Sequence, residues 1–296
     1  MTEITRPIEP RRSLSLSQEA IASRRRAQVR RFISGTLRAI LLLIVLVVLL
    51  FPIVWMALAA FQTHIEIITP EWGFEPTLRN FDKVFSEYNF LRYMGNSFVV
   101  AVLSTFFSLV LGLPAAYAIA RFHYDWLGVV LLAARIVPGI TFLVPWYILF
   151  SRAGLNGSYA ALVLSHMIVS MPFIVWVMVP FFEGLPLEVE ESARIDGASM
   201  LGTFIRIALP LAVPAIMTAT IMSFIFSWNN FMFSLVLSGD DTRTLPVAIF
   251  NFITYASVDW GGLMAAAVLI TLPVLIITAF MQRYVVSGLT AGAIKG

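Results

Sequence analysis

Six long apolar runs constrain this chain more than any other feature of its sequence. A helix that crosses a bilayer needs about 20 mostly apolar residues, because its backbone must hydrogen-bond internally where water is absent. The runs cover residues 37–61, 96–120, 127–150, 159–182, 209–237 and 261–281 of the 296 residues. Little of the chain remains for a soluble domain. We therefore expect an all-α fold, a polytopic membrane protein with six transmembrane helices.

The composition agrees with a membrane protein and excludes several other classes. Hydrophobic residues make up 59% of the chain and charged residues only 12%, whereas an ordinary soluble domain is about 25% charged. The sequence has no cysteine, which excludes a disulfide framework, a thiolate metal site and a cysteine nucleophile. The net charge of +3 is concentrated in residues 1–38, which hold nine arginines and three glutamates. We therefore expect no nucleic-acid partner.

Residues 1–35 form an Arg-rich segment that we expect to be a cytoplasmic tail, because no cleavable signal sequence precedes the first run. Six spans place both termini on one side of the membrane, which then carries fourteen Lys and Arg residues against five on the other side. Positively charged loops are retained in the cytoplasm, so both termini are expected there. The tail is either a solvated topology signal, which we favour, or a binding arm.

Nine prolines lie inside the apolar runs, among them Pro138 and Pro145 in the third run. Proline removes a backbone donor and bends its helix, which a bundle tolerates where neighbours or a wet cavity satisfy the freed carbonyl. Bent helices favour a transport pathway over a plain anchor, although proline is also commoner in membrane helices generally. We expect a bend in the third span near these two residues.

The segment 183–208 between the fourth and fifth runs has 26 residues, although a short turn is enough to reverse a helical hairpin. Pro186 suits the first turn of a helix, and Gly197 suits a left-handed C-terminal cap. These signals predict a short helix, a tight turn and a second short helix. Small residues near the turn allow another protein to approach closely, and Glu191 and Asp196 offer acceptors for its basic side chains. An amphipathic helix lying on the bilayer is the alternative, which the five acids and two arginines of the segment disfavour.

One string in this segment is distinctive. It reads Glu191-Ser192-Ala193-Arg194-Ile195-Asp196-Gly197-Ala198 and is followed by Leu209-Pro210. This string resembles the EAA loop of the inner-membrane permease subunits of binding-protein-dependent ABC importers, with Ser192 replacing the middle alanine of the triplet. Further strings resemble the MalG-like carbohydrate permeases, so that the resemblance covers about residues 36–296: Asn96-Ser97, Ala115-Ala116-Tyr117-Ala118, Trp228-Asn229-Asn230-Phe231, Thr244-Leu245-Pro246, Asp259-Trp260-Gly261 and the ending from Ser287 to Gly296.

The resemblance implies the type I ABC importer permease fold, with residues 36–296 as the permease domain, in the bacterial inner membrane. It implies uptake of a sugar or related polyol by alternating access. The partners implied are a homologous second permease, two cytoplasmic ATPase subunits and an extracytoplasmic solute-binding protein, all at the lipid bilayer. ATP and Mg would be bound by the ATPase, and no cofactor by this chain. The residues implied in coupling to the ATPase are Glu190, Glu191, Ser192, Ala193, Asp196, Gly197 and Ala198.

A polar and aromatic cluster in the fifth run is the first candidate for the substrate path. It consists of Ser227, Trp228, Asn229 and Asn230. Aromatic faces, amides and hydroxyls suit a polyol, but the same residue types also join membrane helices by hydrogen bonds, and we leave both explanations open. After Trp228-Asn229 the family often has an acidic residue, whereas this chain has Asn230, which has no carboxylate.

Arg135 is a second candidate, a costly charge inside the third run. It either faces a cavity or pairs with helix-end carbonyls or a partner subunit. His166 has no other histidine near it in sequence, so we expect a hydrogen-bonded helix contact there rather than a metal or proton site.

Several motifs are absent from the sequence. Its two lysines, Lys83 and Lys295, lie in no phosphate-binding loop, so ATP hydrolysis by this chain is not expected. No metalloprotease motif or nucleophile elbow is present, and we expect neither catalytic residues nor a metal site. The alternative function is a self-contained secondary transporter. It predicts acids inside the spans, and the six runs contain none.

Overall fold

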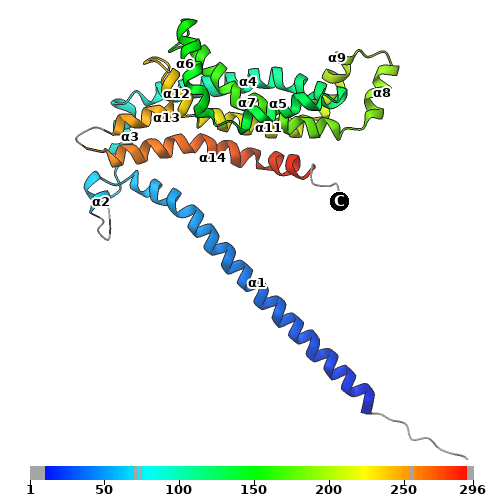
Figure 1. Cartoon of the computed structure of the whole chain (residues 1–296). Helices are drawn as coiled ribbons and strands as arrows, with labels where there is room; N and C mark the ends of the chain where they lie inside the picture. The colour runs from blue at the N-terminus through cyan, green and yellow to red at the C-terminus, as the bar shows by residue number, and fades with distance from the viewer. Residues whose placement is uncertain (1–10, 70–72, 74, 254–256, 292–296) are drawn as a thin grey trace, which may run out of the picture. The chain divides into compact units, whose positions relative to one another are not determined.

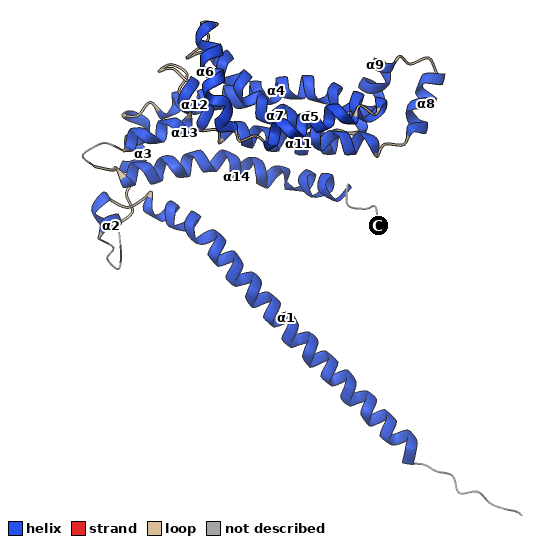
Figure 2. Cartoon of the chain, in the orientation of Figure 1, coloured by secondary structure: helices blue, strands red, loops and turns tan. Residues whose placement is uncertain are grey.

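The structure is a computed structural model that describes residues 11–69, 73, 75–253 and 257–291. Within these, side chains are described except at 11–31, 33, 125, 132, 134, 135 and 281–291. Every named element in the described part is helical (Figure 2). The chain divides into two units, Met1–Met56 and Ala57–Gly296.

The first unit consists, in its described part, of most of helix α1 (Arg11–Ala59). Its stretch Ser34–Ala59 has a mean hydropathy of 3.2 over its most apolar window and is long enough to cross a membrane. This stretch coincides with the first predicted span. Because α1 begins at Arg11, the described part of the predicted tail is also helical.

Four helices form the centre of the second unit: α4 (Phe90–Phe122), α7 (Tyr159–Glu183), α11 (Val213–Trp228) and α14 (Trp260–Ala291). Helix α4 packs along α7, and α11 contacts α4, α7 and α14 (Figure 1). The shorter helices are α2 (His64–Ile68), α3 (Arg79–Ser86), α5 (Asp125–Ile136), α6 (Leu143–Arg152), α8 (Leu187–Ile195), α9 (Met200–Thr203), α10 (Leu209–Leu211), α12 (Met232–Leu237) and α13 (Leu245–Ala248). Three further turns are η1 (Gly139–Phe142), the π-helical η2 (Phe204–Ala208) and η3 (Ile249–Phe252).

Small residues allow α4 and α7 to approach each other closely. Ala116 on α4 is buried in one cluster with Ile174 and Val175 on α7. A Cβ atom added at Gly112 would lie 3.0 Å from the Cγ2 atom of Ile174 on α7. Such small-residue faces are typical of packed membrane helices, because lipid supplies no hydrophobic drive and close contact must supply it instead.

Four described helices are long and apolar enough to cross a membrane, and they correspond to the first, second, fourth and sixth predicted spans. The fifth predicted span is represented by a bent pair, Met200–Leu211 and Val213–Trp228, at an angle of 79°. This pair begins nine residues before the predicted start at Leu209. The described residues therefore contain four candidate spans, or five if the bent pair is one span.

The third predicted span, 127–150, is not a continuous helix. It contains most of α5 and α6, separated by an extended residue, Val137, and the turn η1. Pro138 lacks the donor that would continue α5, and its ring disfavours the helical conformation at Val137. Pro145 lies in the first turn of α6, where it is tolerated. The bend predicted in this run is therefore a complete break at Pro138.

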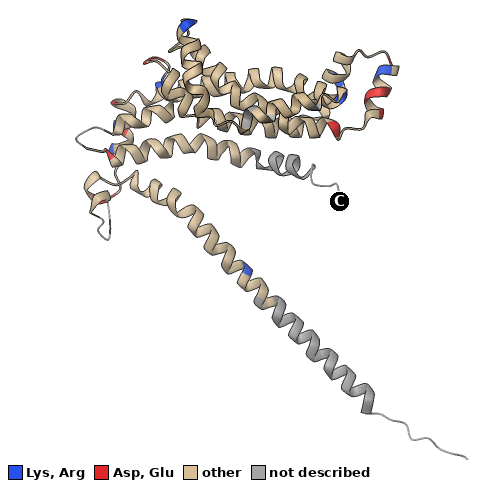
Figure 3. Cartoon of the chain, in the orientation of Figure 1, with Lys and Arg blue, Asp and Glu red and all other residues tan. Residues whose placement is uncertain are grey.

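Charged residues gather at the two ends of the second unit, as Figure 3 shows for its described residues. One end carries α8 and α9, and the opposite end carries α3, α6, α12 and α13 (Figure 1). We refer to these as the α8 end and the α13 end. The charge distribution fits an apolar bundle with one polar surface on each side of a membrane.

Candidate functional site

The segment 183–208 contains the predicted helix, turn and helix at the α8 end of the bundle (Figure 1). Pro186 is the N-cap residue of α8, one position before the predicted first turn, and Glu188 and Glu190 lie in that turn. Acids there are favoured by the positive end of the helix dipole. After α9 the chain continues through η2 and α10 into α11.

The turn between α8 and α9 is built around Gly197, whose φ of +90° lies in the left-handed region that favours glycine. The amide of Ala198 donates to the carbonyl of Ala193 at 2.9 Å, and the amide of Gly197 donates to Arg194 at 3.0 Å. These two bonds form a Schellman cap, which confirms the predicted left-handed end of the helix. Ser199 then accepts from the amide of Gly202 at 3.1 Å and caps α9.

Most of the predicted coupling residues lie on the outside of this turn. Glu191, Ser192, Asp196 and Gly197 are exposed, and Ala193 and Ala198 are half-buried. No pattern in the sequence predicted the apolar part of this surface. Ile195 is 85% exposed and Leu201 67% exposed. Exposed apolar residues with a polar rim are a feature of surfaces that another protein covers.

Glu190 is the exception among the predicted coupling residues, because it is buried and faces the bundle. Its carboxylate accepts from the Arg121 guanidinium at 2.6, 3.0 and 3.1 Å and from the Tyr117 hydroxyl at 2.7 Å. Arg194 lies 3.9 Å away on the exposed side. The Glu190 carboxylate is therefore bonded to side chains of its own chain. We call Glu190, Arg121 and Tyr117 the Glu190 clamp.

The Glu190 carboxylate of the clamp remains ionised at neutral pH. Burial on its own raises the pKa of the Glu190 carboxyl, but hydrogen bonds from Arg121 and Tyr117 outweigh burial and hold the pKa below its ordinary value of 4.5. The side chains of Arg121 and Glu190 are only 5% and 2% exposed. The sequence signal for this pair was Arg121, a lone cation directly after the second apolar run.

Aromatic rings enclose the clamp. The Tyr117 ring lies 5.5 Å from Phe182 at the end of α7, in an edge-to-face arrangement. It also lies 4.9 Å from Phe204 in η2, and the Arg121 guanidinium lies 5.7 Å from the Tyr117 ring centroid. Such ring contacts add to the hydrogen bonds. The ends of α4, α7, α8 and η2 therefore meet at one packed point.

The structure separates the four predicted path residues of the fifth run into two pairs. Ser227 is buried, and its hydroxyl accepts from Ser104 at 2.9 Å and shares a 2.7 Å hydrogen bond with His166. Trp228 is also buried, and its Nε1 donates to the carbonyl of Ile270 on α14 at 3.1 Å. Both residues join helices, as the alternative explanation predicted.

The other two residues lie where α11 ends and α12 begins. Asn229 is exposed, and its amide donates to the carbonyl of Ile225 at 3.0 Å. Asn230 is half-buried and accepts from the amide of Phe233 at 3.1 Å. Of the four residues, Asn229 is the one that presents its side chain on the surface of this subunit. The side chain of Arg135 on α5 lies outside the described residues.

His166 is buried between helices, which confirms the predicted helix contact. Besides Ser227, it lies 3.4 Å from the hydroxyl of Ser234 on α12. Among the residues that the structure describes, no group of three or more His, Cys, Asp and Glu side chains is placed to hold a metal ion.

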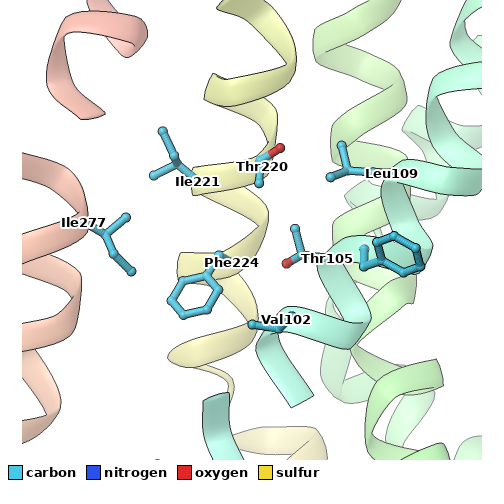
Figure 4. Close-up of a pocket in the computed structure, with 8 residues that line it drawn as sticks. Val102, Thr105, Leu109, Thr220, Ile221, Phe224 and Ile277 are labelled. Carbon is cyan, nitrogen blue, oxygen red and sulfur yellow. The ribbon is translucent and has the colours of Figure 1, made fainter. Parts of the chain in front are cut away.

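One cavity of about 350 Å³ lies between α4, α11 and α14 (Figure 4). Its walls are almost entirely apolar and come from Val102, Thr105, Phe106, Leu109, Thr220, Ile221, Phe224 and Ile277. A polyol needs many hydrogen-bond partners, so this cavity suits hydrocarbon better than a sugar. It shares no residue with the predicted path.

Comparison with known proteins identifies relatives over almost the whole chain. The family described as "Binding-protein-dependent transport system inner membrane component" matches residues 26–291. The sulfoquinovosyl glycerol transport system permease protein SmoH of Agrobacterium fabrum is 35% identical, over 90% of this chain and 96% of that protein. The trehalose/maltose transport system permease protein MalG of Thermococcus litoralis is 33% identical, over 84% of this chain and 93% of that protein.

A solved structure shows the same fold. It is a chain of a bacterial ABC transporter involved in the import of the acidic polysaccharide alginate, and it superposes with a TM-score of 0.71. The match covers 85% of this chain and 96% of that one at 20% sequence identity. The helical arrangement of the second unit is thus the arrangement of an ABC importer permease.

Proposed function

Since this chain belongs to the family of binding-protein-dependent transport system inner membrane components, we propose that it is the permease subunit of an ATP-driven importer for a sugar or related polyol. The two relatives named above carry sugar-containing solutes in their names. The observation that carries the proposal is the exposed helix–turn–helix on a buried ionic base, because it gives an ATPase a rigid element to move.

The partners follow from this function. A homologous second permease completes the translocation path, two ATPase subunits supply the energy, and an extracytoplasmic binding protein delivers the solute. ATP and Mg bind to the ATPase subunits, since the sequence of this chain contains no phosphate-binding loop. The chain itself is not an enzyme.

The α8 end faces the cytoplasm in this proposal, together with both termini, and the α13 end faces the binding protein. The support is the excess of Lys and Arg on that side, fourteen against five when the bent pair and the broken run 127–150 are each counted as one crossing. The segments 62–95 and 238–260 then form the surface that receives the solute from the binding protein.

Docking uses the outside of the turn between α8 and α9. Glu191 and Asp196 accept hydrogen bonds from basic side chains of the ATPase, and charge-assisted bonds of this kind fix orientation as well as adding energy. Ile195 enters an apolar part of the ATPase cleft. ATP-driven closure of the ATPase pair then moves the loop and opens the bundle outward. ATP hydrolysis returns the bundle to its starting state.

The test is a pull-down of the subunit in mild detergent with mass spectrometry of its partners and an ATPase assay. We expect an ATPase and a second permease with the wild type, and loss of the ATPase with Glu191→Arg. Asp240→Arg is the matched control, an exposed acid at the α13 end, and it should retain the ATPase. Absence of any ATPase from folded wild type would contradict the importer and favour a self-contained secondary transporter.

A further inference from the structure

Helix α4 is fixed to a loop at each of its two ends. At the α8 end it carries Tyr117 and Arg121, which hold Glu190 in the Glu190 clamp. At the α13 end it carries Asn96 and Ser97, which hold the backbone of residues 241–245. Asn96 and Arg121 are separated by about 38 Å along the helix, at 1.5 Å per residue.

The contacts at the α13 end are as specific as those of the clamp. The Asn96 amide donates to the carbonyls of Asp241 and Arg243, both at 2.9 Å, and its oxygen accepts from the Tyr159 hydroxyl at 2.6 Å. The Ser97 hydroxyl accepts from the amide of Leu245 at 2.8 Å. Both side chains are buried. We call Asn96, Ser97 and the backbone that they hold the Asn96 latch.

Within the part of the chain that the structure describes, the alternative partner for the clamp is the more distant Arg194. The clamp therefore makes a rigid joint. Removing either charge leaves the other buried and uncompensated, which is far more costly than separating an exposed pair. The latch makes a rigid joint because it satisfies backbone groups that a movement would leave unpaired. A displacement of either loop must therefore move α4 or break these bonds.

The helix between the two joints is braced. Pro114 removes one hydrogen bond from the interior of α4, but at this level α7 packs closely on it, with Ile174 in contact with the Gly112 position. The proline is therefore supported from the side by the neighbouring helix, and α4 remains helical from Phe90 to Phe122.

We propose that α4 transmits displacement of α8 directly to residues 241–245, so that ATPase movement changes the surface offered to the binding protein. Glu190 and Asn96 are positioning residues in this role, because neither touches the solute or ATP. The proposal rests on the function proposed above, since it takes α8 to be moved by an ATPase.

The experiment uses the reconstituted complex with a spin label at Asp240→Cys, an exposed position beside the latch. This chain has no cysteine of its own, and reactive cysteines of the other subunits are replaced. Three quantities are measured: the ATPase retained in the complex, the change in label mobility on adding a non-hydrolysable ATP analogue, and the solute transported per ATP hydrolysed.

In Glu190→Gln we expect the ATPase to be retained, the label response to be lost, and the solute transported per ATP to fall severalfold. Asn96→Leu should give the same result from the other joint. Glu188→Gln, an exposed acid two residues earlier in α8, is the matched control and should behave as the wild type.

Wild-type label response and transport ratio in Glu190→Gln or Asn96→Leu would overturn the proposal. Loss of the ATPase in Glu190→Gln would also overturn it, because Glu190 would then act in docking. Should Glu190→Gln fail to fold, Asn96→Leu decides alone by the same readouts. Failure of the importer function is distinguishable, since it removes the ATPase from the wild type.

Discussion

Two buried polar clusters join the helices of this subunit, and they do so in different ways. The Glu190 clamp at the α8 end is ionic and joins α4 to a loop helix. The cluster of Ser104, His166 and Ser227 between α4, α7 and α11 uses hydroxyls and one imidazole. Charges need several exact partners to offset their desolvation, whereas hydroxyls need few. The ionic contact therefore lies where an exposed loop helix joins the bundle, and the neutral contacts lie within the spans.

The largest effect is expected when the clamp loses its cation. Arg121→Met leaves the buried Glu190 carboxylate without its main partner and should lower the free energy of unfolding by about 3–5 kcal/mol. Unfolding in detergent, followed by circular dichroism, measures this loss. Arg194→Met removes a half-exposed cation at 3.9 Å and should cost about 0–1 kcal/mol. Equal losses in the two variants would show that Arg121 is not the specific partner.

A smaller effect is expected from separating α4 and α7 between the two clusters. Gly112→Leu places a side chain against Ile174, where even a Cβ atom would lie at 3.0 Å, and should destabilise the subunit by about 1–3 kcal/mol. The same unfolding assay applies. Gly95→Leu, on the same helix with open space around its Cβ position, is the control. A Gly112→Leu variant as stable as the control would argue against close α4–α7 packing.

The neutral cluster should respond more weakly than the clamp. Ser227→Ala removes hydrogen bonds to Ser104 and His166, and hydrogen bonds between membrane helices are worth about 0.6 kcal/mol on average, with a maximum of about 1.7. Thermal unfolding of the purified variant checks this value. A loss as large as that of Arg121→Met would contradict the distinction between the two clusters.

The last prediction concerns acid pH, at which the Glu190 carboxylate takes up a proton. Because the pKa of Glu190 is lower in the folded protein than its ordinary 4.5, the unfolded chain binds the proton more tightly. The stabilisation is therefore complete above pH 4.5 and is lost as the pH falls through the folded pKa. Unfolding midpoints measured from neutral to acid pH should fall less steeply in Glu190→Gln. Parallel curves for the variant and wild type would contradict the assignment.

Local signals made much of this structure predictable. Helix caps depend on a few neighbouring residues, so Gly197 and its acids were enough to predict the turn and both loop helices. Four apolar runs became continuous helices because length and hydropathy are also local properties of the sequence. The third run failed as one helix because hydropathy alone does not weigh the donor that Pro138 lacks.

Long-range contacts were not predictable in the same way. Glu190 and Glu191 are adjacent acids in one string, yet one is buried and the other exposed. The difference is set by Arg121, which lies 69 residues earlier in the chain. Likewise, Ser227 and Trp228 face other helices while Asn229 does not, because α11 ends at Trp228. Facing directions depend on neighbours that periodicity cannot identify.

The exposed Ile195 has a consequence for subunits that have not yet found their partners. Covering an isoleucine side chain is worth about 1.5–3 kcal/mol, and in a lone copy this residue is 85% exposed at the tip of the loop. An unassembled copy therefore keeps this apolar side chain in contact with water. In the proposed importer, ATPase binding covers this side chain, so the exposure of Ile195 distinguishes a free subunit from an assembled one.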